Sequence, residues 1–255
     1  MATIPFESSS VKKISATEMP QRLVYTALFT ARFGGFLAEE ELQQAEEQQY
    51  SEDACGRLVS DHYRNTSNRS PTWMMYSCLE HPSISLQIRA DHRTLYELAL
   101  ESNDIVFANQ PLEEVGEETR IAIHEKDLPL ETLFNVRPVG NYPDYKGNRH
   151  PWSEDDREDQ LSFGLSTAID YKTKTDAGVS SQQATQWLTM NVLQNSIASG
   201  SLRSWLQLLD SHARSHKTYE MKSVVSQISD QIQIWIPEIY GWWSSQHRSK
   251  LDLRV

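Results

Sequence analysis

The sequence predicts an α+β fold, in which a mostly helical chain surrounds a small antiparallel sheet. Two apolar periods near the C-terminus, at three- and four-residue spacing, predict helices. The first period consists of Leu202, Trp205, Leu206 and Leu209. The second spans residues 221–236, and Pro237 should end it. Residues 72–89 contain two apolar runs on either side of His81 and Pro82, a pattern that favours two strands joined by a turn.

Length and composition favour one compact unit. The chain has 255 residues, of which 38% are hydrophobic, enough for a sizeable core. Ten glycines and ten prolines are few, so long disordered tracts are not expected. We therefore expect a single domain over residues 1–255, with residues 1–20 loosely ordered.

The net charge restricts the classes of partner. At −11, the chain should repel phosphate-rich surfaces, which argues against nucleic acid and anionic membranes as partners. An anionic small molecule could still bind where Arg, His or a helix N-terminus gathers locally. No stretch of eighteen apolar residues predicts a membrane span, and the first residues contain no apolar signal core. Cys55 and Cys78 show no metal or redox spacing, so we expect a cytoplasmic protein with free thiols.

The segments before and after the predicted strands are less regular. Residues 24–36 form an apolar stretch that a pair of glycines should break. Residues 38–63 are acidic and rich in Gln, which is typical of a helix with a solvated charged face. Residues 104–152 are predicted to be irregular, and residues 139–152 to form a loop.

Capping residues predict three further helix starts. Asp91 can cap a helix that follows the predicted strand, because its side chain can accept a hydrogen bond from a backbone amide of the first turn. Ser153 precedes an acidic first turn and should begin the next helix. Ser180 or Ser181 should begin another.

Residues 201–220 are predicted to form one helix that carries a first candidate site. His212, His216 and Glu220 follow one another at a spacing of four, which would place them on one face. Two histidines at this spacing can ligate a metal, but the glutamate of an H-E-x-x-H motif is missing. Three interpretations stay open: a polar face with solvated histidines, a pocket for an anion or cofactor, and a metal site.

The second candidate site is the run Asp91, His92 and Arg93. It follows a predicted strand and opens a helix, where backbone amides, a histidine and an arginine favour an anion such as a pyrophosphate. The alternative interpretation is a capped helix on the surface without a ligand.

Taken together, these segments resemble the flavin-dependent thymidylate synthase family. That family carries the signature R-H-R-x7-S after a β-hairpin, and here the strand-like residues 82–89 lead into Asp91, His92 and Arg93. A second stretch, between residues 178 and 220, matches the family pattern without a gap. The matching residues there are Gly178, Val179, Ala184, Leu188, Asn191, Arg203, Ser204, Leu209, Ser215, His216 and Glu220.

The resemblance implies a cofactor and an assembly. The family methylates a pyrimidine nucleotide reductively, using FAD, a reduced nicotinamide and methylene-folate, at sites between the subunits of a homotetramer. The residues that would bind FAD here are His92, Arg93, Arg203, Gln207 and His216. Arginine suits the phosphates, and a histidine or amide suits a ring edge. Trp242 and Trp243 would fit a subunit interface, although a position in the core is an equal alternative.

The sequence also departs from the family where the substrate should bind. Asp91 replaces the first arginine of the signature, and Glu101 falls on its serine. Asn103, Thr185 and His212 stand where the family has arginines. A shift of one residue would restore the serine as Ser102, and nearby arginines could compensate. The candidate substrate-binding residues are therefore Arg89, Ser102, His212 and Arg214, and no catalytic residue or metal ligand is assigned.

Three functional hypotheses follow. The first is an FAD-dependent enzyme that transfers a reduced one-carbon unit to a pyrimidine nucleotide or related ring, with altered substrate recognition. The second is a non-catalytic homologue that binds flavin or nucleotide and supports a partner enzyme. The third is a metal-dependent enzyme that uses the histidine and glutamate face of residues 201–220.

Overall fold

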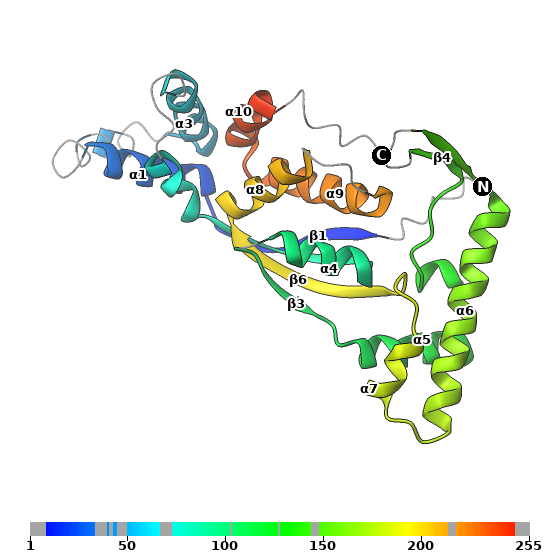
Figure 1. Cartoon of the computed structure of the whole chain (residues 1–255). Helices are drawn as coiled ribbons and strands as arrows, with labels where there is room; N and C mark the ends of the chain where they lie inside the picture. The colour runs from blue at the N-terminus through cyan, green and yellow to red at the C-terminus, as the bar shows by residue number, and fades with distance from the viewer. Residues whose placement is uncertain are drawn as a thin grey trace.

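The computed structural model describes residues 9–33, 40, 43–44, 50–66, 73–102, 104–126, 128–143, 148–213 and 218–247. The strands are β1 (Ser10–Ala16), β2 (Ser83–Asp91), β3 (Val106–Asn109), β4 (Gly140–Pro143), β5 (Arg149–Trp152) and β6 (Leu193–Ser201). The α-helices are α1 (Pro20–Phe33), α3 (Glu52–Thr66), α4 (His92–Glu101), α5 (Leu112–His124), α6 (Glu154–Asp176), α7 (Ser181–Ala184), α8 (Leu202–Ala213), α9 (Tyr219–Trp235) and α10 (Pro237–His247). Short 3-10 helices are η1 (Trp73–Glu80), η2 (Leu130–Thr132) and η3 (Thr185–Trp187). The α+β prediction is confirmed (Figure 1).

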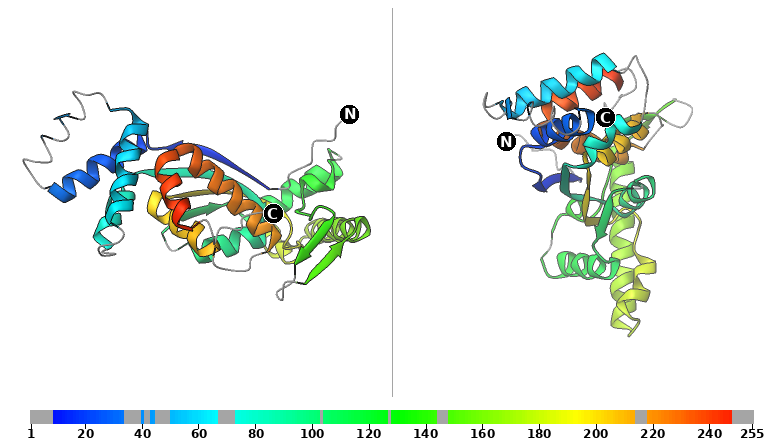
Figure 2. Two further views of the ribbon diagram at one scale, coloured as in Figure 1. Left: turned by 90° about the horizontal axis from the view of Figure 1, so that it is seen from above. Right: turned by 90° about the vertical axis from the view of Figure 1, so that its left-hand side faces the viewer.

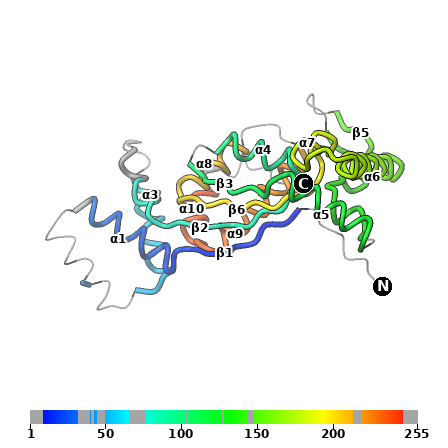
Figure 3. The backbone as a smooth tube through the Cα atoms, turned by 90° about the horizontal axis from the view of Figure 1, so that it is seen from below, coloured from blue at the N-terminus to red at the C-terminus, as the bar shows by residue number. Residues whose placement is uncertain are grey.

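The centre of the molecule is an antiparallel sheet with the order β1-β2-β6-β3. The strands lie side by side in this order in Figure 3. Alternate residues of β2 are buried, which is the period of a strand with one covered face. Leu86 pairs with Ala198 on the covered face, and Gln87 pairs with the exposed Ile197 on the other.

Two predictions for the N-terminal half are wrong. Residues 10–16 form β1 and pair with β2, so this part of the predicted loose N-terminus is ordered. The expected hairpin within residues 72–89 contains only one strand, because residues 73–80 form η1. The run of residues 73–80 is apolar without strict alternation, and such a short run fits a helical turn as well as a strand.

Helices α4, α8 and α9 pack on the covered face of the sheet (Figures 1 and 2). The apolar stripe of α8 is buried as predicted, and Trp205 Nε1 donates to the carbonyl of Ile84 at 3.4 Å. Helix α9 ends before Pro237, also as predicted, but the chain resumes as α10. Trp242 and Trp243 lie in this same core, each 5% exposed, and therefore give no support for a subunit interface.

A second, smaller core lies at one end of the sheet, between α5 and α6. Figure 2 shows these two helices at one end of an elongated molecule and α1 and α3 at the other. The prediction of irregular structure over residues 104–152 is therefore wrong: the segment contains β3, α5, η2 and the β4–β5 hairpin. The β4–β5 pairing likewise corrects the predicted loop, although residues 144–147 lie outside the described residues. Within the described residues, no helix is long and apolar enough to cross a membrane.

The predicted helix starts in this half are confirmed. Ser153 caps α6 with a complete capping box, in which Asp156 is the reciprocal partner. Ser180 caps α7, which is only four residues long. Asp91 caps α4 through the amide of Thr94.

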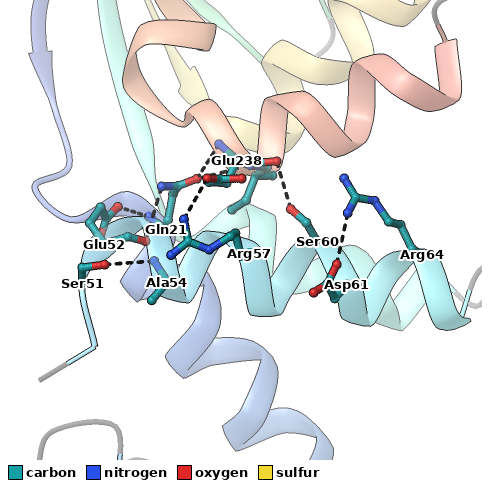
Figure 4. A network of polar contacts seen from close by, with 10 residues as sticks. Gln21, Ser51, Glu52, Ala54, Arg57, Ser60, Asp61, Arg64 and Glu238 are labelled. Atoms are coloured by element: carbon teal, nitrogen blue, oxygen red, sulfur yellow. Dashed lines mark hydrogen bonds and ion pairs between the residues drawn. The ribbon is translucent and has the colours of Figure 1, made fainter. Parts of the chain in front are cut away.

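A partly buried polar network joins α1, α3 and α10 (Figure 4). The carboxylate of Glu52 accepts hydrogen bonds from the amides of Gln21 and Arg22 at the start of α1. The side-chain oxygen of Gln21 in turn accepts from the amides of Glu238 and Ile239 at the start of α10, at 3.0 and 3.2 Å. Each side chain thus satisfies amides that a helix start leaves without an intrahelical acceptor.

We expect Gln21→Leu to lower the free energy of unfolding by about 1–3 kcal/mol, because the start of α10 loses its acceptor inside the protein. Urea unfolding monitored by circular dichroism measures this change. Gln233→Leu is the matched control, since Gln233 is an exposed residue of α9 and its replacement should change stability by less than about 0.5 kcal/mol. Equal unfolding midpoints for the two variants would contradict the proposed role of Gln21.

Candidate functional site

The candidate site is a cavity of about 410 Å³ at the end of β2 where α4 begins. It lies between the sheet and the α6 end of the molecule. The lining residues belong to five separate segments of the sequence, and they come together only in the folded protein. They are Asp91, Arg93, Thr94, Asn135, Arg137, Trp152, Gln160, Phe163, Thr189, Met190, Asn191, Thr218 and Glu220.

The backbone amides at the start of α4 already have acceptors within the chain, unlike the free amides that the anion prediction assumed. The carboxylate of Asp91 is 4% exposed and accepts from the amide and hydroxyl of Thr94, at 2.9 and 2.8 Å. Asn135 Nδ2 donates to the same carboxylate at 2.6 Å. The amides of His92 and Arg93 donate to the carbonyls of Val192 and Met190. An anion bound here would therefore have to be held by the side chains of His92 and Arg93, and the anion hypothesis stays a prediction for them.

The strongest ion pair of the cavity joins Arg137 to Glu220. Its Nε–Oε1 distance is 2.5 Å and its Nη2–Oε2 distance is 3.0 Å, so the contact is bidentate. The hydrogen bonds that Arg137 donates to Glu220 raise the pKa of Arg137 above its ordinary value. The guanidinium also lies 5.4 Å from the ring centre of Tyr142 and 6.0 Å from that of Trp152. The geometry is that of a charge pair held between aromatic rings.

Three of the lining residues each contain a buried polar atom that has no hydrogen-bonding partner in the described part of the chain. They are Trp152 Nε1, Gln160 Oε1 and Asn191 Oδ1. An unsatisfied buried polar atom costs about 1–3 kcal/mol, so natural proteins retain few of them. These atoms are not accessible from the empty cavity, so the cavity is a candidate site on the basis of its volume and lining residues.

The predicted FAD residues fall into two separate groups. His92 and Arg93 lie at the end of β2, where His92 Nδ1 lies 2.9 Å from Gln194 Oε1 and Arg93 pairs with Glu97. Arg203 lies at the opposite end of the sheet, in the first turn of α8. This helix starts directly after Ser201, which pairs with the first residue of β2. At about 3.4 Å per residue, a strand of nine residues separates the groups by about 27 Å.

Arg203 and Gln207 are also apart from the cavity. Arg203 donates to Glu80 at 2.9 Å, and Gln207 is exposed on α8. His216 lies outside the described residues. One chain thus brings only part of the predicted FAD set to the cavity.

The described members of the predicted substrate-binding set, Arg89, Ser102 and His212, do not line the cavity. Ser102 is buried and donates to the carbonyl of Leu98, while His212 is buried on α8 with its Nε2 3.3 Å from Glu101 Oε2. Arg89 donates to the carbonyl of Thr132 from within the sheet. Arg214 lies outside the described residues. His212 thus contacts the last residue of α4, and Ser102 bonds back into the last turn of the same helix.

The prediction of one helix over residues 201–220 is wrong. Helix α8 extends to Ala213, and a new helix, α9, starts after its cap residue Thr218. Glu220 therefore belongs to the first turn of α9 and does not share a helix face with His212. In the described residues, no group of three or more His, Cys, Asp or Glu side chains could hold a metal ion.

Comparison with known proteins supports the fold. No family model and no curated protein matches the sequence. The solved structure of the UMP/dUMP methylase PolB from Streptomyces cacaoi bound with 5-Br dUMP is 17% identical and covers 93% of this chain and 95% of its own, with a TM-score of 0.65. The same methylase bound with 5-Br UMP is 13% identical and covers 94% of this chain and 95% of its own, with a TM-score of 0.64. The chain has a flavin-dependent thymidylate synthase-like fold.

Proposed function

We propose that this protein catalyses an FAD-dependent reductive one-carbon transfer to a pyrimidine nucleotide or related ring, with altered substrate recognition. The observation that carries the proposal is the similarity of fold to a UMP/dUMP methylase along almost the whole of both chains. The proposed donor of reducing power is a reduced nicotinamide, and the proposed one-carbon donor is methylene-folate.

The cavity fits part of the proposed cofactor. Its volume, about 410 Å³, is that of a site for one small ligand or one ring system. The cations needed by the diphosphate lie in two groups at opposite ends of the sheet. FAD therefore fits best as a group shared between chains, with His92 and Arg93 from one subunit and Arg203 and Gln207 from another. This arrangement requires the predicted homotetramer, or at least a dimer.

The chain's own residues would bind and orient the reactants. FAD, if bound, would supply the redox chemistry that connects a reduced nicotinamide to the one-carbon unit. The capped start of α4 fixes one wall of the cavity, and the Arg137–Glu220 pair fixes another. The aromatic side chains of Trp152 and Phe163 would cover a planar ring and exclude water.

A second candidate function is a non-catalytic homologue that binds flavin or nucleotide and supports a partner enzyme. The observation in its favour is that Arg93 and Arg137 are both paired with carboxylates. Both arginines in the described lining of the cavity therefore already have a carboxylate partner, which would weaken their hold on a phosphate.

The test uses purified full-length protein. A flavin absorption band, or its appearance on adding FAD, supports both candidates, and its absence contradicts both. Oxidation of reduced nicotinamide that depends on methylene-folate and on a member of a pyrimidine panel supports the enzyme alone. Within that panel we expect deoxyuridylate to be a poor substrate, because the arginines of the family's phosphate clamp are absent. Robust thymidylate formation at micromolar deoxyuridylate would refute that expectation.

A further inference from the structure

The two ring nitrogens of His92, the first residue of α4, have different surroundings. Nδ1 lies 2.9 Å from Oε1 of Gln194, a buried residue of β6. Nε2 has no hydrogen-bonding partner in the described part of the chain and keeps some access to solvent, since His92 is only partly buried. The ring is thus bound to the protein by one nitrogen and open to a ligand at the other.

The hydrogen bonds around Gln194 determine which nitrogen of His92 carries the proton. The backbone carbonyl of Gln110 can only accept, so the side-chain nitrogen of Gln194 is the atom that donates to it. The side-chain oxygen of Gln194 therefore faces His92. Because an amide oxygen can only accept, Nδ1 of His92 is the donor, and Nε2 of the neutral ring is left without a proton.

The orientation of the Gln194 amide is itself fixed. Gln110 is held beside β6, since its backbone amide donates to the carbonyl of Asn195 at 2.8 Å. Its side-chain oxygen accepts from the backbone amide and the side-chain amide of Asn195, both at 3.3 Å. Gln194 is 3% exposed, and a flipped amide would bring its oxygen against the carbonyl oxygen of Gln110. The acceptor opposite Nδ1 therefore stays in place.

We propose that Gln194 is a positioning residue for His92. It holds the neutral ring with the proton on Nδ1, so that the accessible Nε2 accepts a hydrogen bond from an N–H or O–H group of a bound ligand. An Nε2 without a proton has no donor for a phosphate oxygen, so this side chain does not hold a pyrophosphate. The inference rests on the proposed function for the presence of a ligand beside His92, and on the hydrogen bonds of Gln194 for the position of the proton.

Nitrogen NMR of labelled histidine measures the position of the proton, because the chemical shift of each ring nitrogen depends on whether it is protonated. Spectra are recorded on the full-length protein without ligand at about pH 8.5, above the ordinary histidine pKa of about 6.5. The signals of His92 are those that the His92→Gln variant lacks. We expect the proton on Nδ1, which is opposite to the preference of a free histidine side chain in water. A proton on Nε2 overturns the proposal.

Three variants separate the acceptor from packing. Gln194→Met keeps the length of the side chain and removes the acceptor, so most of the His92 population should move its proton to Nε2. Gln194→Glu keeps an oxygen opposite Nδ1 and should keep the proton there. Gln110→Met is the matched control, because it changes the same end of β6 and leaves the backbone carbonyl that orients Gln194 in place. A proton that stays on Nδ1 in Gln194→Met, or moves equally in Gln110→Met, refutes the role of Gln194.

Two probes test what Nε2 binds. Inorganic pyrophosphate offers acceptors, so its addition should leave the ring shifts of His92 unchanged, and protonation of Nε2 in its presence overturns the proposal. FAD, the cofactor of the proposed function, is titrated by calorimetry. It should bind Gln194→Met at least about fivefold more weakly than Gln110→Met, because the hydrogen bond to Nε2 is lost. Equal FAD affinities of these two variants contradict the proposed contact.

The proton position is measured without any ligand, which separates this inference from the proposed function. An absence of FAD binding contradicts the proposed function, and the proton position and the pyrophosphate result then decide on Gln194 alone. FAD binding and turnover by a protein whose His92 carries its proton on Nε2 does the reverse.

Discussion

Gly116→Val is expected to lower the free energy of unfolding by about 3 kcal/mol, because the added side chain enters a space that is already filled. A Cβ atom built on Gly116 in α5 would lie 2.5 Å from Cζ of Tyr171 and 2.9 Å from its hydroxyl. Tyr171 on α6 is fully buried, so it has little room to move aside. The smaller core between α5 and α6 should therefore open before the main core does.

The matched control is Gly241→Val in α10, where no atom lies within 4 Å of the added Cβ. Glycine and valine differ little in helix propensity, so this change should alter stability by less than about 0.5 kcal/mol. Urea unfolding gives the two free energies, and hydrogen exchange locates the loss. Faster exchange confined to α5, α6 and their neighbours is expected for Gly116→Val. A midpoint equal to that of Gly241→Val would show that the close approach of α5 and α6 matters little.

The sequence revealed those parts of the fold that depend on local chemistry. The buried stripe of α8, the end of α9 before Pro237 and the caps at Asp91 and Ser153 follow from periodicity and from side chains that bond to neighbouring amides. The partners of β2 were not predictable in this way, since β1 and β6 lie far from it in sequence. Residues 73–80 were misinterpreted because a short apolar run does not distinguish a strand from a helical turn.

Helix α5 was missed although the sequence contains a signal for it. Its first turn includes Glu113 and Glu114, and its buried residues Val115, Thr119 and Ala122 recur at helical spacing. No side chain caps the helix, because Pro111 stands at that position. Without a capping side chain, the start of the helix looked like part of a long irregular segment.

The candidate site was predicted in part. Asp91 and Arg93 do line the cavity. The carboxylate of Asp91 accepts hydrogen bonds from Thr94 and Asn135, and the anion hypothesis did not include these bonds. Arg137 was missed because nothing local marks it, and its role depends on Glu220 in a distant helix. The position of Glu220 could have been inferred from Thr218, a cap residue that begins a new helix before it.

We expect Glu220→Gln to change what the cavity binds. The change keeps the shape of the side chain and removes the charge that compensates Arg137, so the described walls gain one net positive charge. A charge-assisted hydrogen bond from this arginine to a phosphate contributes about 1.5–3 kcal/mol. The ratio of uridine 5′-monophosphate affinity to uridine affinity should therefore rise at least about tenfold over the wild type.

Calorimetry with the two uridine compounds measures this ratio, and an added salt series tests its electrostatic origin, since a charge contact at a partly exposed site weakens with ionic strength. The control is Glu131→Gln, because Glu131 also pairs with an arginine, Arg157, but lies outside the cavity. That variant should leave the ratio unchanged. If Glu220→Gln leaves it unchanged as well, the Arg137–Glu220 pair is not what keeps phosphate out of the cavity, and the cation that determines phosphate binding must come from another part of the protein or from a second subunit.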